Sequence, residues 1–169
     1  DYIKVSQGCY DLLKMSKDVS EKSGGAFDLT IAPLTRLWDF DSEKNIVPDD
    51  KIIQDMLQYI DYTKIMLADD DTRAVLKNKN LLLDLGSVGK GAACDEAVSV
   101  YKDNGVSGAV IAVGGSIGVY GEKPYGDKWK IAIRNPDSSA AMGELILTGG
   151  QFVSTSGNYE KAFEKDGIL

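Results

Sequence analysis

The sequence predicts an α+β fold: a mainly antiparallel sheet, N-terminal helices and one further helix after a glycine-rich turn. Apolar residues recur at helical spacing in three segments before residue 61, whereas short strand patterns separated by turn residues dominate the rest. Only one helical pattern, at 90–103, separates the later strands. A doubly wound parallel sheet needs a crossover helix between successive strands, so it fits this order less well.

The helical part begins with residues 5–22, whose apolar side chains follow the 3.6-residue period. A pair of glycines then ends this helix. Residues 29–40 predict a short second helix with Pro33 near its first turn, where proline is tolerated. A third helix is expected after Asp49 or Asp50, since either aspartate suits an N-cap.

Strand patterns follow one another through the second part of the chain. The predicted strands cover 64–69, 73–78, 80–85, two strands within 108–121 about a Gly-Gly turn, 128–135, 143–149 and 151–163, the last broken at Gly157. The three aspartates at 69–71 resemble a metal-binding cluster only superficially. Adjacent acidic residues between two strand patterns are typical of a solvated hairpin tip, which is the expectation here.

Composition restricts the class of protein. The chain has 169 residues, enough for one domain over residues 1–169 with a core of its own, and its two ends read as cuts through a longer domain. The formal net charge is −7 and no run of Lys or Arg occurs, which argues against nucleic-acid binding. No apolar run is long enough to span a membrane, and no signal peptide opens the chain.

The residue types present limit the possible chemistry. The chain contains no histidine, so Ser-His-Asp and Cys-His catalysis and His-ligated metals are excluded within it. Cys9 and Cys94 form no metal-binding motif; two buried thiols are favoured, and a disulfide stays open. Chemistry must therefore come from carboxylates, lysines, hydroxyls, backbone groups or a hard cation held by oxygen atoms.

The segment "DLGSVGKG" at 84–91 joins a strand pattern to a helical pattern. It is not a Walker A loop, because Asp84 and Gly91 stand where that motif needs Gly and Ser or Thr. Lys90 falls in or just before the first helical turn, where the helix dipole disfavours a cation unless an anion is near. A phosphate could bind there. Alternatively, Lys90 pairs with Asp84 or points to solvent.

Two other segments carry polar groups next to glycine. In "SGGAFD" at 23–28, Asp28 or Thr30 could cap the next helix with Phe27 in the core, or Asp28 could bind a polar head group. The cap is favoured from the residues alone. The hydroxyl-rich "VSTSG" lacks the G-x-S-x-G pattern of a nucleophile elbow, so a strand end with local turn bonds is expected.

Taken together, four ordered stretches resemble the ApbE family, the FAD:protein FMN transferases. They are "SGGAFDLTIAPLTRLWDF", "LLLDLGSVGKGAACDEAV", "GAVIAVGGSIGVYG" and "FVSTSGNYEKAF". The resemblance implies transfer of FMN from FAD to a threonine hydroxyl of a target protein, with Mg²⁺ and release of AMP. It also leaves open an FAD pyrophosphatase that yields FMN and AMP. A non-catalytic flavin-binding module is the alternative of another class.

The resemblance also implies site residues. Those that would line the FAD site are Ala26, Phe27, Asp28, Asp84 and Lys90. Ser87 falls where the family offers a backbone carbonyl to the metal ion, so its side chain matters little there. Family members are lipoproteins on the extracytoplasmic face of the membrane, which implies the same location here.

The chain departs from the family pattern at three places. "AVGGS" at 112–116 replaces N-x-G-G-N, which changes the polar groups of that hairpin, and Leu29 replaces a proline in a change expected to be neutral. The family continues past the "DG" at 166–167 with an H-x-x-D-P-x-T-G segment that completes the metal site, whereas this chain stops at Leu169. The sequence therefore predicts that residues 1–169 alone have little or no transferase activity.

Overall fold

The structure is a computed structural model that describes residues 3–40, 46–68, 73–76, 79, 81–126, 128–157, 162 and 164. The chain divides into two compact units, one formed by Asp1–Val88 with Lys161–Leu169 and the other by Gly89–Glu160. We describe each unit by itself. The prediction of a single domain over residues 1–169 stays a prediction.

The first unit contains the predicted N-terminal helices. α1 spans Gln7–Lys22 and is capped by Ser6, whose hydroxyl accepts from the Cys9 N–H at 3.3 Å. The other helical elements of this unit are the 3₁₀ turn η1 (Leu29–Ile31), α2 (Ala32–Trp38), α3 (Asp50–Leu57) and the 3₁₀ turn η2 (Tyr62–Lys64). Asp49 caps α3 by accepting from the Lys51 N–H, as its place in the sequence predicts.

A small antiparallel sheet completes the first unit. Its strands are β1 (Ile3–Lys4), β2 (Ile65–Ala68) and β3 (Arg73–Leu76), in the order β1-β3-β2. The buried cluster consists of Leu13, Leu29, Ile65 and Ala74, so α1, η1 and both strands of the hairpin share one core. The predicted hairpin tip at 69–72 lies outside the described residues.

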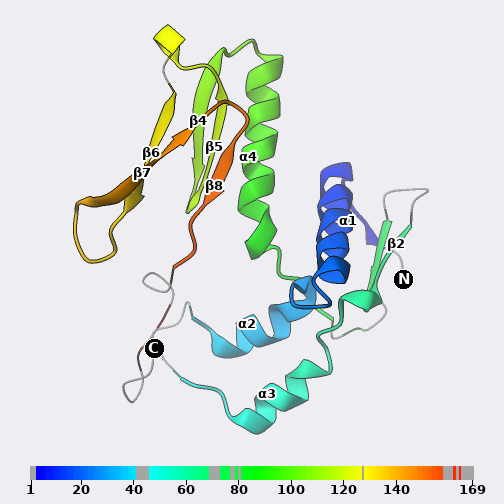
Figure 1. Cartoon of the computed structure of the whole chain (residues 1–169). Helices are drawn as coiled ribbons and strands as arrows, with labels where there is room; N and C mark the ends of the chain where they lie inside the picture. Colours follow the sequence, from blue (N-terminus) through cyan, green and yellow to red (C-terminus); the bar gives the residue numbers. More distant parts are fainter. Residues whose placement is uncertain are drawn as a thin grey trace. The chain divides into compact units, whose positions relative to one another are not determined.

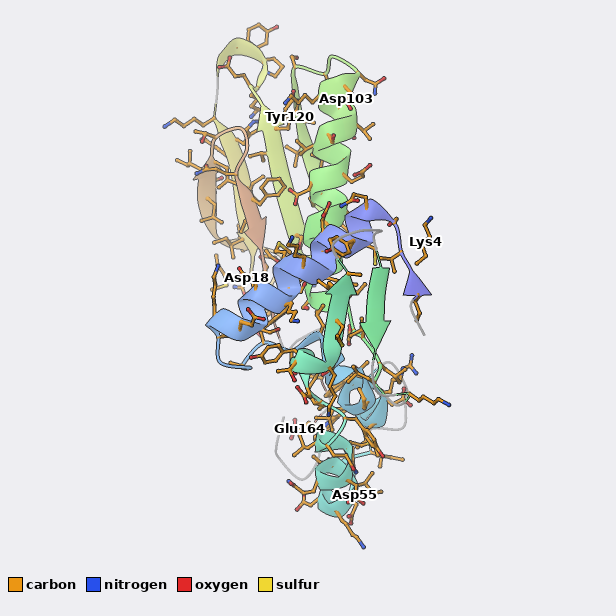
Figure 2. The ribbon with its side chains drawn as sticks, turned by 90° about the vertical axis from the view of Figure 1, so that its right-hand side faces the viewer. Lys4, Asp18, Asp55, Asp103, Tyr120 and Glu164 are labelled. Atoms are coloured by element: carbon orange, nitrogen blue, oxygen red, sulfur yellow. The ribbon has the colours of Figure 1, made fainter. Side chains whose placement is uncertain are left out.

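The second unit contains most of α4 (Gly86–Asp103) and five strands. β4 (Gly108–Val113), β5 (Ser116–Gly121) and β8 (Phe152–Ser154) form one antiparallel sheet, and β6 (Trp129–Arg134) pairs with β7 (Ala141–Leu147). The 3₁₀ turn η3 (Pro124–Gly126) lies between β5 and β6. α4 runs beside the β4-β5-β8 sheet (Figure 1), and Figure 2 shows Asp103 of α4 and Tyr120 of β5 at the same end.

Three predicted elements differ from the structure. The strand predicted over 151–163 is shorter, because β8 covers only Phe152–Ser154 and residues 155–157 form no strand; positions 158–161 and 163 lie outside the described residues. Residues 81–85 form no strand, although Leu81 is buried. Among the described residues, one backbone hydrogen bond links this stretch to another segment, from the Asp84 N–H to the Leu29 carbonyl. A single bond does not make a strand ladder. α4 begins at Gly86 instead of residue 90. The glycine-rich stretch is thus the first turn of the helix, and Lys90 is its fifth residue.

The predicted α+β class is confirmed, since all described strand pairs are antiparallel and the helices precede most of them. Cys94 is buried, Cys9 is half-buried, and both are free thiols. Within the ranges described above, no helix is long and apolar enough to cross a lipid bilayer.

Candidate functional site

In the first unit, the Asp28 carboxylate binds the protein's own chain with both oxygen atoms. Oδ1 accepts from the Thr30 N–H at 2.8 Å and from the Thr30 hydroxyl at 2.7 Å. Oδ2 accepts from the Tyr62 N–H at 2.9 Å, a contact that spans 34 residues of sequence. The cap that was favoured from the sequence is confirmed, and Phe27 packs against the buried cluster as that interpretation expects.

A second capping aspartate lies next to the first. Asp61 caps η2 and accepts from the N–H and the hydroxyl of Thr63, while its other oxygen lies 3.1 Å from the Lys64 ammonium. The Thr63 hydroxyl, helped by Lys64, holds the pKa of the Asp61 carboxyl below its usual value. The Asp61 N–H donates to the Thr30 hydroxyl at 2.7 Å, so the two caps are hydrogen-bonded to each other.

Asp84 has a similar positioning role at the start of α4. Its Oδ1 accepts from the Gly86 N–H at 2.8 Å, and its Oδ2 accepts from the Thr35 hydroxyl at 3.0 Å. Its own N–H donates to the Leu29 carbonyl at 2.7 Å. One of the free N–H groups at the helix start is therefore satisfied by a carboxylate, which also suits the helix dipole. Asp84 fixes the first residues of α4 against η1 and α2.

Ser87 is exposed in the first turn of α4. In a regular helix its carbonyl would accept from the N–H four residues later, which leaves the second lone pair of the oxygen for a cation. Among the described residues, no group of three or more acidic or cysteine side chains forms a ready-made metal site. Mg²⁺ commonly binds through one or two protein oxygens together with ligand phosphates and water, so this carbonyl fits such an ion as one donor of several.

In the second unit, Lys90 lies beside the Gly-Gly turn between β4 and β5. It is exposed, and its Cδ lies 3.3 Å from the position that a Cβ on Gly114 would occupy. Gly114 also has φ of +57°, which L side chains rarely adopt. Glycine there lets the lysine stem lie directly on the turn. The stem of Lys90 therefore packs close to the backbone of this turn.

The hydroxyl-rich segment after β8 joins the same turn. The Thr155 N–H donates to the Gly115 carbonyl at 2.8 Å, and a Cβ on Gly115 would come within 2.7 Å of the Thr155 carbonyl oxygen. The hydroxyls of Ser116 and Ser154 lie 3.0 Å apart in paired positions of β5 and β8. The predicted strand end is confirmed, but its hydrogen bonds run across strands instead of forming local turns.

Comparison with known proteins now decides the family. A model of the ApbE family matches residues 1–168. The chain belongs to the ApbE family. It is 30% identical to an FAD:protein FMN transferase of Klebsiella pneumoniae over 168 residues, which cover 96% of this chain and 48% of that protein. The chain therefore spans about half the length of the curated relatives that it matches.

Solved structures agree with this membership. The ApbE protein of Thermotoga maritima superposes with a TM-score of 0.88 at 29% identity, covering 99% of this chain and 55% of that one. The apo flavinyl transferase ApbE of Pseudomonas stutzeri gives a TM-score of 0.81 at 31% identity over 99% of this chain and 52% of that one. The fold described above is therefore an ApbE fold over nearly the whole chain.

Within this ApbE chain the predicted site residues fall into two groups. Phe27, Asp28 and Asp84 lie in the first unit and contact η1 or the core, and Ala26 is exposed in the loop before them. Lys90 lies in the second unit at the Gly-Gly turn. Their assignment as FAD contacts, and that of the Ser87 carbonyl as a metal ligand, stays a prediction.

Sequence reasoning missed the partners that hold these residues. Thr35, Asp61 and Tyr62 were not singled out, nor was the Ser116–Ser154 pair. One signal was present: Asp-x-Thr occurs at 28–30 and again at 61–63, and an aspartate two residues before a threonine is typical of a capped turn. The bonds between the two caps have no sequence signal, because they depend on tertiary packing.

Proposed function

We propose that the protein containing this chain transfers FMN from FAD to a threonine hydroxyl of a target protein, with Mg²⁺, and releases AMP. The match of the ApbE family model to residues 1–168 carries the proposal, together with relatives named FAD:protein FMN transferase. The order and local geometry of the glycine-rich segments support it. In particular, Lys90 and the first turn of α4 offer an ammonium and helix N–H groups that suit a phosphate.

The reaction balances without a histidine. The threonine oxygen forms a bond to the phosphorus of the FMN half of FAD, the bridging P–O bond breaks, AMP leaves, and the hydroxyl proton passes to solvent or to a nearby oxygen. Phosphoryl transfer depends mainly on positioning and on neutralising charge, so a chain with no histidine is compatible with it. Bound Mg²⁺ would supply charge neutralisation at the phosphates. Lys90 would orient the phosphates, and Asp84 would hold the Ser87 segment in place.

The test uses the complete protein with FAD, Mg²⁺ and a target-domain peptide. Mass spectrometry should find a peptide adduct of FMN, and chromatography should find one AMP for each adduct. Free FMN and AMP without an adduct would favour the pyrophosphatase, in which water replaces the threonine hydroxyl. FAD binding without either product would favour a non-catalytic flavin-binding module. A reaction with EDTA in place of Mg²⁺ is the control and should give neither product.

The location of the protein is also a proposal. By resemblance to its family, we place it on the extracytoplasmic face of the membrane as a lipoprotein. Fractionation of cells that express the complete protein, followed by labelling with a membrane-impermeant reagent, tests this. Recovery in the cytoplasmic fraction would contradict it.

A further inference from the structure

The two capped turns of the first unit have the same local chemistry. In Asp28-Leu29-Thr30 and in Asp61-Tyr62-Thr63, the aspartate Oδ1 accepts from both the N–H and the hydroxyl of the threonine two residues later. The surroundings of the two threonines differ. Thr30 is fully buried, with 0% of its surface exposed, whereas Thr63 is exposed.

In the described hydrogen bonds between the two turns, the side chains come from the first turn and the backbone N–H groups from the second. Thr30 donates its hydroxyl hydrogen to Asp28 and accepts the Asp61 N–H with the same oxygen. Asp28 in turn accepts the Tyr62 N–H with its second oxygen. The Thr30 hydroxyl and the Asp28 carboxylate therefore satisfy two backbone N–H groups of the η2 turn, and we name this pair with its two N–H partners the Asp28–Thr30 clamp.

The glycine-rich loop before Asp28 rests on the same turn. A Cβ on Gly25 would lie 3.5 Å from Cε1 of the Tyr62 ring, so the loop backbone runs close over that ring. Within the loop, the Gly25 N–H donates to the Ser20 carbonyl and the Phe27 N–H donates to the Ser23 hydroxyl. Its accessible surface is the exposed run 23–26, which contains the predicted FAD contact Ala26.

We propose that Thr30 is a positioning residue for FAD binding, which acts through Asp28 to hold loop 23–28 on η2. The inference rests on the proposed function. It differs from the direct role that the family resemblance implies for Asp28, because bonds within the chain already use three of the roughly four acceptor positions of this carboxylate. Asp28 therefore acts on the ligand site by fixing the conformation of loop 23–28. If the clamp opens, the loop spends part of its time displaced. The apparent FAD affinity should then fall in proportion to the fraction of molecules in which the loop is still in place.

The experiment measures FAD binding to the complete protein by flavin fluorescence, with thermal unfolding of each variant alongside. Thr30→Val keeps the side-chain shape, removes the hydroxyl and leaves the part-buried Asp61 N–H without this partner, so binding should weaken by about tenfold or more. Thr30→Ser restores the hydroxyl and should recover most of that loss. Thr63→Val removes the matched bond of the exposed cap and should bind FAD within about twofold of wild type.

The outcomes separate the competing interpretations. If Asp28 contacts FAD directly and the clamp is irrelevant, Asp28→Ala loses affinity while Thr30→Val binds like wild type, which overturns the inference alone. Wild type that binds no FAD overturns the proposed function and this inference with it. Should Thr30→Val fail to fold, hydrogen exchange of wild type decides: FAD must slow exchange of the Asp61 and Tyr62 N–H groups, by linkage, and unchanged rates would contradict the role.

Discussion

Replacing Lys90 tests the phosphate assignment directly. Lys90→Met keeps an unbranched stem against Gly114 and removes the ammonium, whereas Lys90→Ala removes both. A charge-assisted contact to a phosphate contributes about 1–3 kcal/mol, which corresponds to roughly 5- to 150-fold in FAD affinity. Because Lys90 is exposed, either change should alter the free energy of unfolding by only about 0.5 kcal/mol. We therefore expect a large loss of binding with little loss of stability.

The assay is FAD titration of the complete protein, followed by thermal unfolding of the same samples. Lys102→Ala provides the matched control, since Lys102 is also exposed but lies in the last turn of α4. It should bind FAD as wild type does. If Lys90→Met and Lys102→Ala bind FAD equally well, the phosphate assignment is wrong. If the Lys90 variants lose stability alone, packing of the Lys90 stem on Gly114 explains the residue instead.

Three other predictions concern the turn, the acceptor and the length of the active chain. Gly115→Ala places a Cβ within 2.7 Å of the Thr155 carbonyl oxygen and should lower the free energy of unfolding, measured by denaturant titration, by about 1–3 kcal/mol. Gly143→Ala is the control: its Cβ meets open space, so the same titration should show almost no change. This chain should carry no covalent FMN. The targets of the family resemble D-x-x-[ST]-G-A-[ST], and in the segment that matches best, "DNGVSGAV" at 103–110, Val110 stands where the motif needs a hydroxyl. An FMN adduct on this chain in intact mass spectrometry would contradict the prediction. Residues 1–169 alone should release far less AMP than the complete protein at equal FAD and Mg²⁺, because the described residues contain no cluster of metal-binding side chains. Equal rates of AMP release would refute this prediction.

Local sequence signals predicted most of the fold correctly. The helical period identified α1, the position of Asp49 before an apolar period identified the start of α3, and a Gly-Gly pair between apolar runs identified the β4-β5 hairpin. The strand at 80–85 was wrong for a physical reason. An apolar run shows that residues are buried, as Leu81 is, but a strand also needs a neighbour with which to exchange backbone hydrogen bonds.

The assignment of the candidate site residues to FAD and metal stays a prediction, and the sequence did not predict the contacts that hold these residues in place. The glycine-rich stretch predicts a turn that leads to a helix at residue 90, whereas in the structure Asp84 caps Gly86 and the helix starts four residues earlier. From the sequence, Asp28 could be either a cap or a ligand-binding residue. The structure shows that it also accepts from the Tyr62 N–H, a distant partner that the sequence does not indicate. Long-range bonds of this kind depend on the packing of η1 against η2, which has no local signature.

Electrostatics assigns different tasks to the acidic and basic residues of these segments. A pyrophosphate is anionic, and a bare carboxylate within about 4 Å of it would be repelled by roughly 4 kcal/mol near a protein surface. Asp28 and Asp84 bind N–H or O–H donors of the chain with both oxygens, which favours their charged form and leaves each carboxylate with its negative charge. The formal charge of −7 acts over distances that physiological salt screens beyond about 8 Å. In the proposed function, recognition of the phosphate charge would therefore fall to Lys90, helix N–H groups and a bound cation. Asp28 would hold the η2 turn and Asp84 would hold the start of α4.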